Sequence, residues 1–103
     1  MREQDIQNSI RLALNDYAVI FRGNVGRVRM ADGRFFDTGL PPGFCDLFGY
    51  RKSDGKMIFI EVKTKKGRLR DAQKHFIETM KQYPVIVGVA RSAAEAIQIV
   101  EEG

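Results

Sequence analysis

The stretch that decides the fold runs from residue 43 to residue 63 and reads GFCDLFGYRKSDGKMIFIEVK. Its two apolar segments, CDLFGY and KMIFIEVK, have the composition of β-strands. The Asp54-Gly55 step between them suits a tight turn, because glycine adopts positive φ values without strain. We therefore predict an antiparallel hairpin that belongs to the core, although Asp46 lies in one strand and Glu61 in the other.

The hairpin is expected to bring these two acidic residues together. If the turn is centred on residues 53–55, antiparallel pairing sets Asp46 opposite Glu61 or Val62, although the two acids are fifteen positions apart in the sequence. Alternation along the second strand puts Glu61 and Lys63 on the same face. Both faces of that strand are apolar where it begins. We therefore expect a central strand, with Glu61 and Lys63 at the end where burial gives way to a cleft.

Two neighbouring carboxylates need positive charge beside them. At a separation of ~4 Å they repel each other by about 4 kcal/mol at an effective dielectric constant of about 20. A hard divalent cation such as Mg²⁺ or Mn²⁺ meets this need, because it binds the oxygens of carboxylates, water and phosphate. Lys63 is the alternative counter-charge, and in that case Asp46 and Glu61 have only structural roles in an ion pair or a turn.

The remaining sequence alternates between helical and strand patterns. Apolar stripes predict helices over residues 3–16 and 70–82, the second ending before Pro84. Strands are expected at residues 17–22, 25–30, 34–39 and 85–90. The segment SAAE at residues 92–95 predicts a capping box that begins a last helix, with Ile97 and Val100 on its buried face. The chain is therefore expected to be a single domain, residues 1–103, of the mixed α/β class with helices packed on a sheet.

Two polar helix residues are expected to face the sheet. Glu3 shares a stripe with Gln7 and with apolar residues, so it is a candidate metal ligand; the alternative is an ordinary first-turn acid favoured by the helix dipole. Gln73 lies on the apolar face of the second helix, where it would contact a phosphate or merely cap the sheet. We assign no chemical role to His75, on the opposite face, or to Cys45, which is expected to pack in the core.

Basic residues surround the acidic pair in the sequence. The chain has 17 Lys and Arg against 13 Asp and Glu, a net charge of +4, which favours an anionic partner. Gly67, where a loop meets a helix, offers backbone amides to an anion. The candidate phosphate-binding residues are Lys65, Lys66, Arg68, Arg70, Lys74, Arg22 and Arg27. Together with the carboxylates and Lys63, they favour phosphodiester chemistry.

Other sequence features limit the class of protein. A single cysteine excludes an intrachain disulfide and a metal site built on cysteine pairs. The first ten residues lack the apolar segment of a signal peptide, and no apolar run approaches the ~18 residues that a membrane span needs. We therefore expect a soluble protein of the reducing cytoplasm.

The combination of GFCD with IFIEVK resembles the signature of the PD-(D/E)XK nuclease superfamily, an Asp and a Glu-x-Lys on adjacent core strands. The segments EQDIQNSIRLAL, FRGNVG, AQKHFIETM and VIVGVARSAAEAIQIV extend the likeness over nearly the whole chain. Together they are similar to the virus-type replication-repair nuclease (VRR-NUC) family, and to its stand-alone phage and bacterial members. The resemblance implies a restriction-endonuclease-like α-β-β-β-α-β core with a mixed sheet flanked by helices. One departure is the bulk of Phe44 and Cys45, where the family usually has small residues or a proline before the aspartate.

The resemblance also implies metal-dependent, structure-selective cleavage of branched DNA, such as Holliday junctions or flaps, by a homodimer. The residues that it implies are catalytic are Glu3, Asp46, Glu61 and Lys63, supported by Gln73. Mg²⁺ or Mn²⁺ would be held by Asp46, Glu61, the carbonyl of Val62 and Glu3. Two rival interpretations are a non-catalytic nucleic-acid-binding module that uses the basic loop alone, and a protein-interaction domain with an incidental basic surface.

A homodimer needs an interface, and residues 25–42, VGRVRMADGRFFDTGLPP, are the candidate. A short edge ribbon in a monomer of this size cannot bury all the apolar side chains of this segment, which are Val28, Met30, Phe35, Phe36 and Leu40. The alternative is that Phe35 and Phe36 fold back over their own sheet.

Overall fold

The structure, a computed structural model, describes the backbone of residues 1–103 and all side chains except those of Arg27 and Val28. The elements, in chain order, are α1 (Glu3–Ala13), β1 (Ala18–Arg22), β2 (Arg27–Arg29), β3 (Phe35–Asp37), β4 (Leu47–Arg51), β5 (Met57–Val62), α2 (Asp71–Met80), β6 (Ile86–Ala90) and α3 (Ala93–Glu102). A short 3-10 helix (Leu14–Asp16) follows α1. Each predicted helix and strand is present, most with ends within two residues of the prediction, and the mixed α/β class is confirmed.

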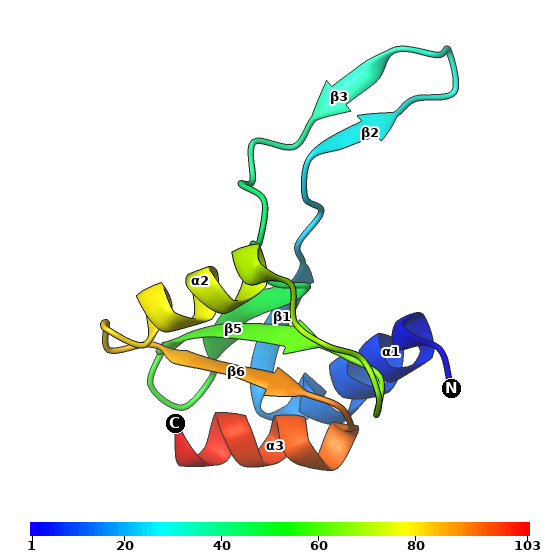
Figure 1. Cartoon of the computed structure of the whole chain (residues 1–103). Coiled ribbons are helices and arrows are strands. Elements are labelled where there is room, and N and C mark those ends of the chain that lie inside the picture. The colour runs from blue at the N-terminus through cyan, green and yellow to red at the C-terminus, as the bar shows by residue number, and fades with distance from the viewer.

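Four strands form one mixed sheet in the order β1-β4-β5-β6 (Figure 1). β1, β4 and β5 are antiparallel neighbours, whereas β6 runs parallel to β5 and is reached through α2. The β4-β5 register pairs Leu47 with Ile60, so extending it by one residue sets Asp46 opposite Glu61. The predicted hairpin is therefore confirmed, and β5 is a central strand because it has a paired strand on each side.

α1 and α3 cover one face of this sheet, and α2 covers the other (Figure 1). The hydrophobic core lies on the first face, where Ile58, Ile60 and Val62 of β5 are buried with Ile10 of α1 and Val100 of α3. Burial of alternate residues of β5 on this face leaves the residues between them, Phe59 and Glu61, on the face of α2.

Aromatic rings attach α2 to the second face. The ring centroid of Phe44 lies 5.4 Å from that of Phe48, 6.1 Å from that of Phe59 and 5.2 Å from that of Phe76 in α2. All three pairs meet edge to face, the arrangement that the ring quadrupoles favour. The bulky residue that departs from the usual family pattern thus has a packing role, since Phe44 joins the sheet to α2.

β2 and β3 form a separate two-stranded ribbon that projects from the body of the protein (Figure 1). We call residues 24–42 the arm. Glycines stand where the arm leaves the body and where it returns, and at both the backbone packs too closely for a side chain. At Gly23, an added Cβ would lie 2.3 Å from the Cys45 carbonyl oxygen. At Gly43, where φ is +88°, it would lie 2.4 Å from the Ala72 carbonyl oxygen. Phe36 is 58% exposed on the arm, so it does not fold back over the sheet.

The capping box of α3 differs in part from the prediction. Ser92 Oγ accepts a hydrogen bond from the Glu95 backbone N–H (3.2 Å), as expected for an N-cap. The Glu95 carboxylate, however, accepts from the backbone N–H of Arg91 (2.7 Å), one residue before the N-cap. Ala96 and Val100 are the buried residues of this helix, whereas Ile97 is only partly buried because it lies at the edge of the apolar stripe.

Candidate active site

Asp46 and Glu61 meet where β4 begins and β5 ends. Asp46 immediately precedes β4, and its Oδ2 accepts a hydrogen bond from the backbone N–H of Val62 (2.8 Å). Glu61, next to Val62, is only 2% exposed. The predicted pairing of the two acids therefore occurs, and one of them is almost completely removed from solvent.

The burial of Glu61 changes its acidity. Its pKa is raised from 4.5 to about 9, first by burial, then by a side-chain hydrogen bond with Asp46, and further by the negative charges of Asp46 and Glu3. The positive charge of Lys63 acts in the opposite direction but does not offset these effects. Without a cation, Glu61 therefore holds a proton at neutral pH and is hydrogen-bonded to Asp46.

Gln73, in the first turn of α2, fixes the orientation of Glu61. Its Nε2 donates to Glu61 Oε1 (3.0 Å), while its own Oε1 accepts from the backbone N–H of Arg70 (2.9 Å). The second bond determines which end of the amide faces the carboxylate. Gln73 is buried, so the prediction that it faces inward is confirmed, and its contact is with Glu61.

Lys63 follows β5 directly and is 7% exposed. Its backbone N–H donates to the Ala90 carbonyl (3.2 Å), which holds it in register with the end of β6. Within the described part of the chain, its ammonium group forms no ion pair. Lys63 alone therefore does not neutralise the acidic pair, and its ammonium group is left for another negative group.

The donor atoms of the site fit a hard divalent cation. Protein donors occupy one oxygen of each acid, which leaves Asp46 Oδ1 and Glu61 Oε2 without an N–H donor among the described residues. The N–H and C=O of one strand residue point to the same side, so the Val62 carbonyl is directed to the same side as Asp46. No group of three Asp, Glu, His or Cys side chains in the described part could hold a metal. Two carboxylates completed by water are nevertheless a usual set for Mg²⁺.

Glu3 is half-buried in the first turn of α1 and is not part of a three-acid cluster with Asp46 and Glu61. Its charge nevertheless contributes to the raised pKa of Glu61, so it lies close enough to act on the site. A contact between Arg22 Nη2 and Gln4 Oε1 (3.5 Å) places this first turn beside the end of β1. Glu3 therefore acts on the site through its charge.

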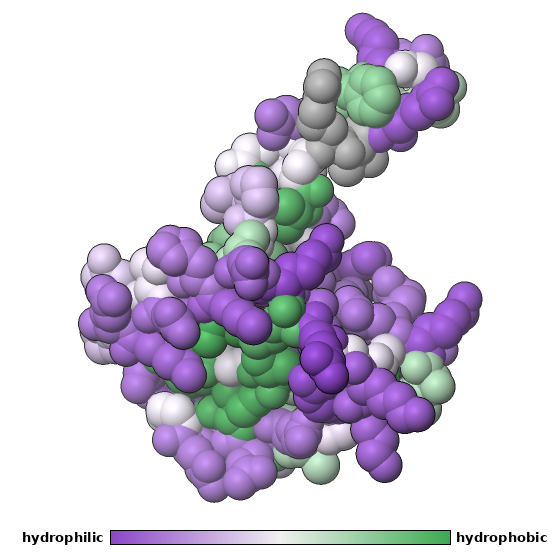
Figure 2. Space-filling view, in the orientation of Figure 1, coloured by the Kyte–Doolittle hydropathy of each residue, from purple (hydrophilic) through white to green (hydrophobic). Residues whose placement is uncertain are grey.

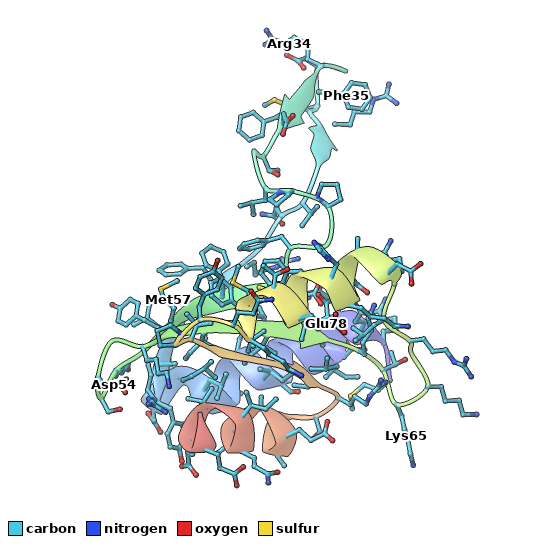
Figure 3. All side chains as sticks on the ribbon, turned by 60° about the vertical axis from the view of Figure 1, so that its left-hand side comes forward. Arg34, Phe35, Asp54, Met57, Lys65 and Glu78 are labelled. Atoms are coloured by element: carbon cyan, nitrogen blue, oxygen red, sulfur yellow. The ribbon has the colours of Figure 1, made fainter. Side chains whose placement is uncertain are left out.

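The basic residues predicted to bind phosphate lie on the surface around this end of the sheet. The exposed ones are Lys65, Lys66, Arg68, Arg70, Lys74 and Arg22, whereas the side chain of Arg27 lies outside the described residues. Figure 3 shows Lys65 pointing away from the body. His75 is exposed, and Cys45 is buried with its pKa raised to about 12, first by burial and then by the charge of Glu61, so neither is positioned for catalysis.

Arg91 was not singled out by its sequence context, yet it holds the basic loop in place. From the end of β6, its Nη1 donates to the carbonyl oxygens of Thr64 (2.5 Å), Gly67 (2.7 Å) and Lys65 (3.4 Å). These three carbonyls belong to the loop that follows Lys63. A single arginine after a strand gives no sequence signal for such a contact, because the carbonyls it binds are more than twenty residues away.

A cavity of about 380 Å³ adjoins the acidic pair at the base of the arm. Asp46 and Gln73 line it on the side of the sheet, Arg70 lines it at the start of α2, and Asn24 and Gly43 line it on the side of the arm. The cavity therefore combines one acid of the pair, Asp46, with the positive charge of Arg70.

A mixed sheet with helices on both faces, and with an Asp and a Glu-x-Lys at adjoining strand ends, defines a nuclease domain of restriction-endonuclease-like architecture. The chain belongs to the VRR-NUC domain family, whose model matches residues 27–94, more than half of the chain. The match includes Asp46, Glu61, Lys63 and Gln73, and it begins after α1. The family is one of nucleases, so the substrate is DNA.

No curated protein matches the chain. Among the helices that the structure describes, none has the length and apolar character that crossing a membrane requires.

Proposed function

We propose that this domain is a metal-dependent endonuclease that cleaves phosphodiester bonds in branched DNA. The observation that carries the proposal is the acidic pair, in which Glu61 is almost completely buried beside Asp46 and has its pKa raised to about 9. A site that has to hold a proton between two carboxylates is suited to exchange it for Mg²⁺ or Mn²⁺. A structural acid would instead be paired with Lys63, and no such ion pair is present among the described residues.

The cation would be held by Asp46 and Glu61 and by the carbonyl of Val62. When bound, it would supply a more acidic water and would polarise the scissile phosphate. Gln73 would keep Glu61 in one orientation through its bond to Oε1. Lys63 would orient the attacking water or stabilise the negative charge that develops on the phosphate. Glu3 would act on the water around the cation from α1.

DNA would be bound through its phosphates by the exposed basic residues beside the site. The loop after Lys63 presents Lys65 and Lys66, and Arg91 fixes its backbone through three carbonyl oxygens. Contacts with phosphates carry no sequence information, so binding should depend on salt rather than on base sequence. This is the behaviour expected of an enzyme that selects the shape of DNA.

A homodimer is part of the proposal, because a four-way junction needs two opposed cuts and each chain offers one acidic pair. The arm is the candidate interface, since Met30 and Phe36 are exposed there by 50% and 58%. Leu40 is partly buried, and the side chain of Val28 lies outside the described residues. Figure 2 shows a second apolar area over β6, the edge strand between α2 and α3. Substitutions on the arm and on β6 can test separately which of the two surfaces forms the dimer interface.

The test combines metal binding with cleavage. Calorimetry with Mn²⁺ on the wild-type protein should show binding, and labelled Holliday junctions and flaps should be cut in Mg²⁺ or Mn²⁺ but not in EDTA. A linear duplex of the same sequence is the control and should be cut more slowly. Salt-dependent DNA binding without metal binding or cleavage would instead indicate a non-catalytic module. Cleavage in EDTA would contradict the proposal that cleavage requires a metal ion.

A further inference from the structure

Gln7 has a buried polar atom that the chain itself does not satisfy. The residue is 8% exposed, and its Oε1 is the only buried side-chain nitrogen or oxygen in the described part of the chain that lacks a hydrogen-bond partner. Leaving a buried acceptor unpaired destabilises a fold, so natural proteins rarely retain one without a reason. A ligand that donates a hydrogen bond at this position is such a reason.

Gln7 lies near the start of α1, which borders the candidate active site. Gln7 follows Glu3 by one helical turn, so both lie on the same face of α1. The first turn of α1 reaches Arg22 through Gln4. The residue after Arg22, Gly23, donates its N–H to the carbonyl oxygen of Asp46 (2.7 Å). The start of α1 therefore lies over the end of the sheet that carries the acidic pair.

The other buried residues of α1 are hydrocarbon side chains. The buried neighbours of Gln7 along α1 are Ile6 and Ile10, which pack in the apolar core with Val62. Hydrocarbon side chains cannot donate to an amide oxygen. The donors lie on the side of the site, where Glu3 and Glu61 are acceptors when ionised, whereas the Lys63 ammonium group and the water around a bound cation can both donate.

We propose that Gln7 is a positioning residue of the metal site, and that its Oε1 accepts a hydrogen bond from a water in the hydration shell of the divalent cation. The inference rests on the proposed function, because it requires Asp46 and Glu61 to hold that cation. Mg²⁺ and Mn²⁺ bound by two carboxylates keep several waters, and the residues that accept from those waters orient them. Glu3 and Gln7 then form a row of two acceptors on α1, one charged and one neutral.

The test uses Gln7→Met, which removes the amide with little change of length or volume. Without metal, the midpoint of thermal unfolding should rise by roughly 4 °C, because an unsatisfied buried acceptor has been removed. Calorimetry should show Mn²⁺ binding about tenfold weaker than in the wild type, in the range expected when a residue that orients metal-bound water is lost. A gain in stability together with a loss of metal affinity is not expected of a residue with only a structural role.

Gln98→Met is the matched control, because Gln98 is an exposed glutamine on α3 whose Nε2 donates to Glu102 Oε1 (3.3 Å). Its Mn²⁺ affinity should equal that of the wild type. Gln7→Glu keeps an acceptor at the position and should bind Mn²⁺ at least as tightly as the wild type. Equal Mn²⁺ affinities of Gln7→Met and wild type, or equal weakening by Gln7→Met and Gln7→Glu, would overturn the inference. A wild-type protein that binds no Mn²⁺ would overturn the proposed function with it.

Discussion

Replacing Glu61 by glutamine should change how the stability of the metal-free protein depends on pH. Because the pKa of Glu61 rises from 4.5 to about 9 on folding, the folded protein keeps a proton that the unfolded chain loses. A raised folded-state pKa means that the stabilisation is fully present below pH 4.5 and is lost as the pH rises towards about 9. One retained proton corresponds to about 1.4 kcal/mol per pH unit, so the free energy of unfolding should fall by about 3 kcal/mol between roughly pH 6 and 8 from this group alone.

The glutamine variant lacks this proton equilibrium but keeps the shape of the side chain. Its amide oxygen can accept from Gln73 as Glu61 does, and its amide nitrogen can donate to Asp46 in place of the proton on Glu61. Urea unfolding in EDTA at pH 6, 7 and 8 gives the free energy of unfolding of both proteins. The value for the variant minus that for the wild type should increase by about 3 kcal/mol between pH 6 and pH 8. Subtracting the two proteins removes the contributions of other titrating groups, such as the exposed His75.

The same reasoning predicts the effect of a bound cation. Saturating Mn²⁺ should remove the difference in pH dependence, because the cation replaces the proton on Glu61. Calorimetry in two buffers with different ionisation heats should show release of about one proton per Mn²⁺ at neutral pH. Parallel stability curves for the wild type and the variant in EDTA would refute the account of a protonated acidic pair.

Three further predictions concern cleavage, DNA binding and assembly. Asp46→Asn should lower the cleavage rate by at least about a thousandfold, while circular dichroism shows an intact fold. Cleavage near the wild-type rate in Mg²⁺ would disprove the catalytic role of Asp46. The residues expected to bind phosphates are Lys65, Lys66, Arg68 and Lys74. Neutralising one of them should weaken binding to all DNA sequences alike and reduce the slope of log affinity against log salt concentration by roughly one unit. A loss of affinity for some sequences only would count against this. Phe36→Glu should give a folded monomer in sedimentation equilibrium at micromolar concentration, whereas a persistent dimer would place the interface elsewhere, for example on β6.

The hairpin could be predicted from the sequence because its determinants are local. The Asp54-Gly55 turn and the alternation of β5 fix the register, and the register alone brings Asp46 to Glu61. The sequence predicts that Gln73 faces inward, but not that it contacts Glu61, because its partner depends on where α2 crosses the sheet. That crossing is set by the contacts of Phe44 with Phe76 and with the sheet, which the helical stripe does not encode.

The arm shows a different limit of sequence reasoning. Its strands and its surplus of apolar side chains were predictable, because both follow from composition. Its projection from the body was not, because it depends on the close approach of Gly23 to the Cys45 carbonyl and of Gly43 to the Ala72 carbonyl. These contacts join the arm to residues beside Asp46 and Gln73, so the base of the arm and the acidic pair share one boundary.

The position of the site at the strand ends explains why its chemistry depends on register. Glu61 faces α2 only because Ile60 and Val62 on either side of it are buried in the opposite core. A slip of one residue in the β4-β5 pairing would turn Glu61 into that apolar core and expose its neighbours. It would also separate Asp46 from the Val62 N–H that now anchors it. The same hydrophobic alternation that stabilises the sheet therefore determines where the acidic pair forms.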